Sequence, residues 1–184
     1  MNITKLVDFL IQSNDLKKLY RSGWLAAGLK NPESVADHSY QTALIAMILS
    51  DLTGQDTGRV VKLALLHDLA EAIIGDATPS QKERYEDYET EEREAMKETL
   101  SRLPEELARE YILLWVEYEE GSTPEAEIVH DADKLDMIIQ AFTYEKTLGG
   151  IEPLETFWDI KPKSDISKKM FKLLKSKRDE HDKP

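Results

Sequence analysis

The sequence of 184 residues contains no cysteine, and this absence removes several classes of chemistry. Without thiols, the chain has no disulfide framework, no thiolate zinc site, no iron–sulfur cluster and no cysteine nucleophile. Glycine and proline are scarce, at eight and seven residues, which excludes a collagenous or low-complexity chain. Any catalysis must therefore use oxygen ligands, hydroxyl groups or the four histidines.

Positive charge and long apolar runs are also in short supply. Because 24 basic residues face 36 acidic ones, the net charge is −12, and we expect no nucleic-acid polymer as the main partner. The longest apolar run, residues 43–49, is far too short to span a bilayer. The N-terminal residues 1–12 have an amphipathic helical period and lack the continuous apolar core of a signal peptide. We therefore expect a cytoplasmic protein with no membrane contact.

Helical periodicity is present almost throughout, whereas β-branched runs with a period of two are absent. No internal repeat or Gly/Ser-rich linker divides the chain. We therefore expect one all-α domain over residues 1–184, with its motif-bearing core at about 16–148. The helices predicted from caps and stops span about 34–52, 57–70, 80–102, 104–118, 124–148 (before a Gly149-Gly150 stop) and 165–178.

Charge is unevenly distributed along the chain. Residues 82–120 contain 14 acids and six bases, whereas residues 161–183 contain nine bases and four acids. Solvated helix faces are the simplest interpretation, and self-association between the unlike patches is the alternative.

Most catalytic motifs are missing, including a Gly-rich phosphate loop, a dinucleotide fingerprint, His-Glu-x-x-His and a nucleophile elbow. His67-Asp68 stands out because it lies in the apolar run VVKLALLHDLAEAIIG, with Glu71 one helical turn further on. Burying these groups costs several kcal/mol unless something pairs with them. The plain alternative is a hydrogen-bond network between two helices.

Two further residues are unremarkable when each is considered alone. His38 could be a satisfied core histidine, and Asp133 could be an ordinary surface acid. Together with His67 and Asp68, however, they offer two imidazoles and two carboxylates from three helices. Such a set suits Zn, Co, Mn, Fe or Ni and leaves positions open for water and substrate.

The order His38, His67-Asp68, Asp133 resembles the HD-domain metal-dependent phosphohydrolases. The surrounding segments look like the branch of that family that contains the 5′-deoxynucleotidases and their archaeal and eukaryotic relatives. The similarity covers roughly residues 16–144 and includes RSGWLAAGLKNPESVADHS, LLHDLAEAIIGDATP and HDADKLDMIIQAFTYE. This resemblance implies an all-α HD fold, a homodimer, and hydrolysis of deoxynucleoside 5′-monophosphates to deoxynucleoside and phosphate.

The resemblance also implies residue roles. One divalent ion (Co, Mn, Zn, Ni, Fe or Mg) would be held by His38, His67, Asp68 and Asp133. Glu71 would handle the proton of the attacking water, or else orient a ligand histidine. The substrate-side residues would be Arg21, Trp24, Asp76 and Thr78.

Among these residues, Asp76 matches the family aspartate associated with the sugar and with substrate orientation, although an Asx turn would explain it equally well. Arg21 would clamp phosphate, and Trp24 would shape a pocket that excludes a 2′-hydroxyl. In the bacterial enzymes the arginine directly precedes the tryptophan. The order Arg21-Ser22-Gly23-Trp24 instead matches the eukaryotic and archaeal side of the family.

Other histidines and tryptophans are not expected in the site. His130 is set aside because the resemblance places the ligand at Asp133, and His181 lies in a charged tail. Trp115 and Trp158 are expected to fill core or dimer contacts. Two other functions stay open: an HD phosphohydrolase acting on a cyclic or pyrophosphorylated nucleotide, and a non-catalytic helical protein braced by its metal.

Overall fold

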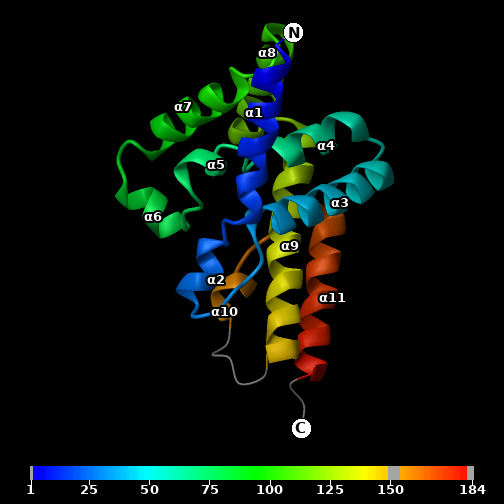
Figure 1. The fold of residues 1–184 in the computed structure, drawn as a ribbon. Coiled ribbons are helices and arrows are strands. Elements are labelled where there is room, and N and C mark those ends of the chain that lie inside the picture. Colours follow the sequence, from blue (N-terminus) through cyan, green and yellow to red (C-terminus); the bar gives the residue numbers. More distant parts are fainter. Residues whose placement is uncertain (1, 149–153, 182–184) are drawn as a thin grey trace. The chain divides into compact units, whose positions relative to one another are not determined.

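The computed structural model describes residues 2–148 and 154–181, and every regular element in these ranges is a helix (Figure 1). The strand-like pairing in the described ranges is an isolated antiparallel bridge between Tyr20 and Ser34. The all-α prediction is therefore confirmed. Within the same ranges, no helix combines the length and the apolar character that crossing a membrane would require.

The chain forms two compact units, the first comprising residues 1–40 and 65–120. In this unit α5 packs against α7 and the 3₁₀ helix η1, and α7 also packs against α8. Buried Met96, Leu100, Leu114 and Trp115 contribute to its core. Its elements are α1 (Ile3–Ser13), η1 (Asn14–Lys17), α2 (Ser22–Ala26), the start of α3 (Val35–Thr53), the end of α4 (Thr57–Leu66), α5 (Glu71–Ile74), α6 (Pro79–Arg84), α7 (Tyr88–Leu100) and α8 (Glu105–Glu120).

The second unit comprises residues 41–64 and 121–184. It contains most of α3 and α4 together with α9 (Pro124–Leu148), α10 (Glu155–Trp158) and α11 (Asp165–His181). α11 runs alongside α9, and α10 also packs against α9 (Figure 1). The carboxylate of Asp131 on α9 accepts the backbone N–H groups of Lys163 and Ser164, at 2.6 and 2.8 Å, and so fixes the chain just before α11.

Several predicted helix ends are confirmed by their capping contacts. Ser34 Oγ accepts the N–H of Asp37 at 3.2 Å, and the Asp37 carboxylate accepts the N–H of Ser34 at 2.9 Å, a reciprocal cap that starts α3. Thr123 Oγ1 accepts the N–H of Ala126, and Pro124 is the first residue of α9. The Gly149-Gly150 stop lies outside the described residues.

The helix expected at 57–70 is shorter than predicted. α4 ends at Leu66, residues 67–70 form a tight turn, and α5 begins at Glu71. The N–H of Leu69 donates to the carbonyl of Leu66, and the N–H of Glu71 donates to that of Asp68, both three residues back. These tighter hydrogen bonds interrupt the α-helical ladder without disturbing the apolar pattern that led to the prediction.

The helix expected at 80–102 is divided into α6 and α7. Tyr85 has an extended backbone (φ −106°, ψ 100°), which ends α6. The charged residues around this break offer no apolar stripe to bury, and the buried face of α7 begins only at Glu92. The short helices α2 and α10 were not predicted, because four or five residues are too few to show a period.

Candidate functional site

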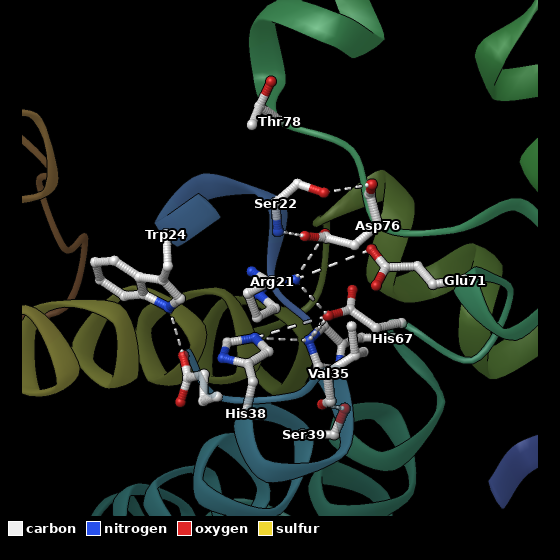
Figure 2. Close-up of polar contacts among 12 residues, drawn as sticks. Arg21, Ser22, Trp24, Val35, His38, Ser39, His67, Glu71, Asp76 and Thr78 are labelled. Atoms are coloured by element: carbon white, nitrogen blue, oxygen red, sulfur yellow. Dashed lines mark hydrogen bonds and ion pairs between the residues drawn. The ribbon is translucent and has the colours of Figure 1, made fainter. Parts of the chain in front are cut away.

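Two histidines from separate segments of the first unit face each other. His38 lies in the first turn of α3, where the Ser34 cap fixes the start of the helix, and His67 directly follows α4. Their side chains are 0% and 1% exposed, and their Nε2 atoms are 3.4 Å apart (Figure 2). Two imidazole nitrogens therefore point to one buried place.

Asp68 brings a carboxylate oxygen to the same place. Its Oδ2 lies 3.1 Å from His67 Nε2 and 3.7 Å from His38 Nε2. Burial opposes ionisation of Asp68, but His67, Arg21 and His38 outweigh this effect and hold its pKa well below the ordinary value. Two nitrogens and an ionised oxygen within 3.7 Å of one another are a donor set that fits a divalent transition metal.

Arg21 joins the acidic side chains next to these donors. Its Nη1 lies 3.0 Å from Asp68 Oδ2, 3.1 Å from Asp76 Oδ1 and 4.0 Å from Glu71 Oε1 (Figure 2). Its backbone N–H donates to the carbonyl of Glu33, which helps to place the residue at the start of α2. The guanidinium thus balances a cluster of carboxylates, and a phosphate would have to share it with them.

Glu71 is a buried acid at the start of α5. Its Oε2 has no hydrogen-bond partner among the described residues. Burial, together with the nearby negative charges of Asp68 and Asp76, raises the pKa of Glu71 well above its ordinary value. A buried carboxyl group with a raised pKa beside a possible metal site is suited to proton transfer.

Asp76 is held by residues far away in the sequence. Its carboxylate accepts hydrogen bonds from Arg21 and from the backbone N–H of Ser22, and its carbonyl accepts Ser22 Oγ at 2.7 Å. These contacts with α2 explain its orientation, so a local Asx turn is not needed. Asp76 follows Gly75, whose φ of +80° lies in the left-handed region that favours glycine.

Thr78 and Trp24 make structural contacts. Thr78 caps α6, because its Oγ1 accepts the N–H of Gln81 at 3.3 Å, and its side chain points away from the imidazoles in Figure 2. Trp24 is 1% exposed, and its Nε1 donates to Glu33 Oε1 at 2.8 Å. The indole is thus fixed in the core and could form only a rigid wall of a binding pocket.

The remaining candidates lie on α8 to α11. Asp133 is half-buried on α9 in the second unit, where His130 is also half-buried. Trp115 and Trp158 are both 2% exposed, in agreement with a core role. The side chain of His181 lies outside the described residues.

Sequence reasoning missed Ser22 as a member of this cluster. The available signal was its position between Arg21 and Trp24, both of which the family pattern predicts on the substrate side. The contact of the Glu33 carboxylate with the Trp24 indole was also not predicted.

A sequence model described as HD domain matches residues 13–174. The chain belongs to the HD domain family. Among curated members it is 40% identical over 154 residues to the 5′-deoxynucleotidase HDDC2 of Homo sapiens, covering 84% of this chain and 75% of that protein. It is also 40% identical over 164 residues to the 5′-deoxynucleotidase hdd1 of Schizosaccharomyces pombe, covering 85% and 82%. The resemblance to this branch of the HD domain family is thus confirmed.

Solved structures of archaeal proteins share this HD fold. A conserved hypothetical protein from Pyrococcus furiosus is 38% identical, with a TM-score of 0.77, covering 94% of this chain and 99% of that one. The PH0347 protein from Pyrococcus horikoshii is also 38% identical, with a TM-score of 0.76, covering 92% and 96%. The fold predicted from the sequence is therefore that of experimentally solved relatives.

Proposed function

We propose that this protein is a 5′-deoxynucleotidase, which hydrolyses deoxynucleoside 5′-monophosphates to the deoxynucleoside and inorganic phosphate. The observation that carries the proposal is the convergence of His38, His67 and Asp68 next to the buried acid Glu71. The curated relatives named 5′-deoxynucleotidase, which are about 40% identical over most of the chain, support the same activity.

The metal would be one divalent ion held by His38, His67, Asp68 and Asp133. The first three form the donor set described above, and Asp133 is added on the family pattern. When bound, such an ion supplies Lewis-acid stabilisation of the negative charge on the phosphate. The donors suit Co, Mn, Zn, Ni or Fe, and Mg is the remaining candidate.

The proton transfer is assigned to Glu71. Its Oε2, buried and without a partner among the described residues, takes a proton from the water that attacks phosphorus. As the bond between phosphorus and the 5′-oxygen breaks, the same carboxyl group can return that proton to the leaving oxygen. The raised pKa of Glu71 suits both steps.

The substrate-side roles follow the same family pattern. Arg21 would hold the phosphate, while Trp24, Asp76 and Thr78 would line the sugar side. The rigid Trp24–Glu33 pair supports the pocket role, because a fixed indole can exclude an additional 2′-hydroxyl.

We further propose one HD domain built from both units, present in the cytoplasm as a homodimer. The family match across residues 13–174 supports the single domain. Light scattering would then give twice the chain mass of 21.1 kDa, and the mass of a monomer would contradict the homodimer.

A hydrolysis screen with Mn, Co, Mg, Ni and Zn in parallel tests the activity. Among deoxynucleoside and nucleoside 5′-monophosphates, cyclic nucleotides and guanosine polyphosphates, the deoxynucleoside monophosphates should release phosphate most efficiently. Asp68→Ala should lose both bound metal and phosphate release. Equal metal content and equal activity in that variant would contradict the proposal.

Other outcomes of the screen would favour the other functions. Hydrolysis confined to cyclic or pyrophosphorylated nucleotides would indicate a different HD phosphohydrolase. A metal that raises the melting temperature, without hydrolysis of any nucleotide, would indicate a structural metal.

A further inference from the structure

Ser22 makes two of the contacts that hold Asp76. The backbone N–H of Ser22 donates to Asp76 Oδ2, and its Oγ donates to the Asp76 carbonyl at 2.7 Å. The preceding residue, Arg21, donates from Nη1 to the other carboxylate oxygen, Oδ1, at 3.1 Å. Two adjacent residues therefore fix both the side chain and the backbone of Asp76, as Figure 2 shows.

The segment held in this way is a non-helical connection. Residues 75–78 join α5, which begins with Glu71, to α6, which is capped by Thr78. Gly75 ends α5 with a positive φ of 80°, a backbone conformation that favours glycine. Because residues 75–78 have no helical ladder of their own, contacts from outside the segment must determine where Asp76 points.

We infer that Ser22 is a positioning residue, whose two hydrogen bonds to Asp76 set the affinity for the sugar side of the substrate. The inference rests on the proposed function for the role of Asp76 toward substrate, while the hydrogen bonds themselves do not depend on it. Ser22 lies between Arg21 and Trp24, which are adjacent in the bacterial enzymes. The hydrogen bonds of Ser22 with Asp76 give this additional residue a function.

The local backbone allows both donors to be removed without disturbing α2. Ser22 is the first residue of that helix, a position that proline tolerates because its N–H has no partner within the helix. Arg21 has φ −63° and ψ 118°, which suits a residue preceding proline. Ser22→Pro therefore deletes the N–H and the hydroxyl, Ser22→Ala deletes only the hydroxyl, and Ser22→Thr keeps both.

A matched control is available at the end of α7. Ser101 Oγ also donates to a backbone carbonyl at 2.7 Å, that of Glu98, but Ser101 is exposed and lies outside the site. Ser101→Ala removes a bond of the same kind and length, and should leave the kinetics unchanged.

Steady-state hydrolysis of dAMP and AMP, together with hydrogen exchange of the amides at 75–78, tests the inference. Ser22→Pro should raise KM for dAMP about tenfold and Ser22→Ala about threefold, with kcat changed less than KM, since a misplaced binding group weakens ground-state binding. Ser22→Thr should behave as wild type. Amide exchange at 75–78 should be faster in Ser22→Pro, and the preference for dAMP over AMP should fall.

An unchanged KM and unchanged exchange in a folded Ser22→Pro protein would overturn the inference. So would a fall in kcat at constant KM, because a merely structural defect reduces the active fraction without altering affinity. If the wild type fails to hydrolyse dAMP while exchange still accelerates in Ser22→Pro, the proposed function fails and the positioning contact stands. If the wild type hydrolyses dAMP but neither KM nor amide exchange changes in Ser22→Pro, the proposed function stands and the positioning inference fails.

Discussion

At the scale of single residues, one guanidinium nitrogen of Arg21 lies within 4.0 Å of carboxylate oxygens from Asp68, Glu71 and Asp76. The side chains of Arg21 and Asp68 are each 15% exposed, and those of Glu71 and Asp76 are buried further. Acids held this closely repel each other unless a cation is present. A divalent ion bound at Asp68 would relieve part of the same repulsion, so the arginine and the metal should compensate for each other.

Replacing Arg21 should reveal this compensation. In EDTA, Arg21→Met should lower the free energy of unfolding by about 2–4 kcal/mol, because it leaves buried carboxylates without their partner. Added Mn²⁺ should restore part of that loss. Urea denaturation followed by circular dichroism measures both values.

The control for this prediction is Arg102→Met. Arg102 pairs with Glu98 on α7, whose side chain is 62% exposed, and the substitution should cost less than about 1 kcal/mol with no dependence on metal. Equal losses in the two variants, unaffected by Mn²⁺, would show that Arg21 does not balance the site.

Replacing Glu71 or Asp68 by the corresponding amide should change different properties of the protein, kcat in one case and metal content in the other. Glu71→Gln keeps the shape of the side chain but removes the proton acceptor, so kcat should fall about 10²–10⁴-fold while metal content is retained. Asp68→Asn should instead lower the metal content itself. Phosphate release and elemental analysis distinguish the two, and full activity of Glu71→Gln would exclude it as the base.

At the scale of helices, the sequence predicts those helix ends that depend on the side chains of neighbouring residues. Ser34 and Pro124 mark the starts of α3 and α9, because capping is decided by neighbouring residues. The end of α4 at Leu66 could not be predicted, because the change to hydrogen bonds three residues apart does not alter the period of the apolar residues. The break between α6 and α7 was missed for a related reason, since helical propensity continues through the charged residues there.

Arg178 joins three helices of the second unit. On α11, its Nε and Nη2 donate to the two carboxylate oxygens of Glu145 on α9, both at 2.8 Å, and Nη2 also donates to Glu155 on α10 at 2.8 Å. Hydrogen bonding from Arg178 holds the pKa of Glu155 below its ordinary value. A carboxylate whose pKa is lower in the folded state stabilises the protein at pH values above its pKa in the unfolded chain. This stabilisation is lost as pH falls through the folded-state pKa.

Arg178→Met should therefore destabilise the protein most near neutral pH. We expect a loss of about 1–3 kcal/mol, mainly from the pair with the less exposed Glu145. The part of this difference that the pair with Glu155 contributes should shrink as pH falls below the ordinary glutamate value of 4.5. Thermal unfolding from pH 7 to pH 3 measures it, with Lys168→Met, at an exposed pair with Asp165, as the control. A difference independent of pH would contradict the ion-pair explanation.

At the scale of the whole molecule, the charge of −12 bears on substrate size. A single small phosphate can be held by a metal and one arginine within an acidic protein. A polyanion meets repulsion along its whole length.

A 5′-phosphorylated DNA 20-mer should accordingly be hydrolysed with a kcat/KM at least about 100-fold below that of dAMP at low salt. The gap should narrow as salt screens the repulsion. Phosphate release from both substrates between 20 and 500 mM NaCl, taken as roughly the range over which screening changes most, measures it. Equal efficiency at low salt would mean that net charge does not select the substrate.

The motif residues could be identified from the sequence because His67, Asp68, Glu71 and Asp76 lie close together along it. Their partners could not, because pairings such as Arg21 with Asp68, or Ser22 with Asp76, join residues about 50 positions apart. Which donor meets which acceptor over such a separation depends on the folded path of the chain and not on local spacing. The sequence therefore predicted Arg21 and the acids that lie around it, but not which of them pair, nor the contacts of Ser22 with Asp76.

The burial of all three tryptophans gives the protein an internal optical reporter. Trp24 and Trp115 belong to the first unit and Trp158 to the second, and each is 1–2% exposed. Their emission should be blue-shifted when folded and should move to the red as each unit opens. With Trp158 replaced by Phe, fluorescence reports on the first unit alone, while circular dichroism reports on both. Coincident denaturation curves from the two signals would show that the units unfold as one cooperative transition, and separated curves would show that each melts on its own.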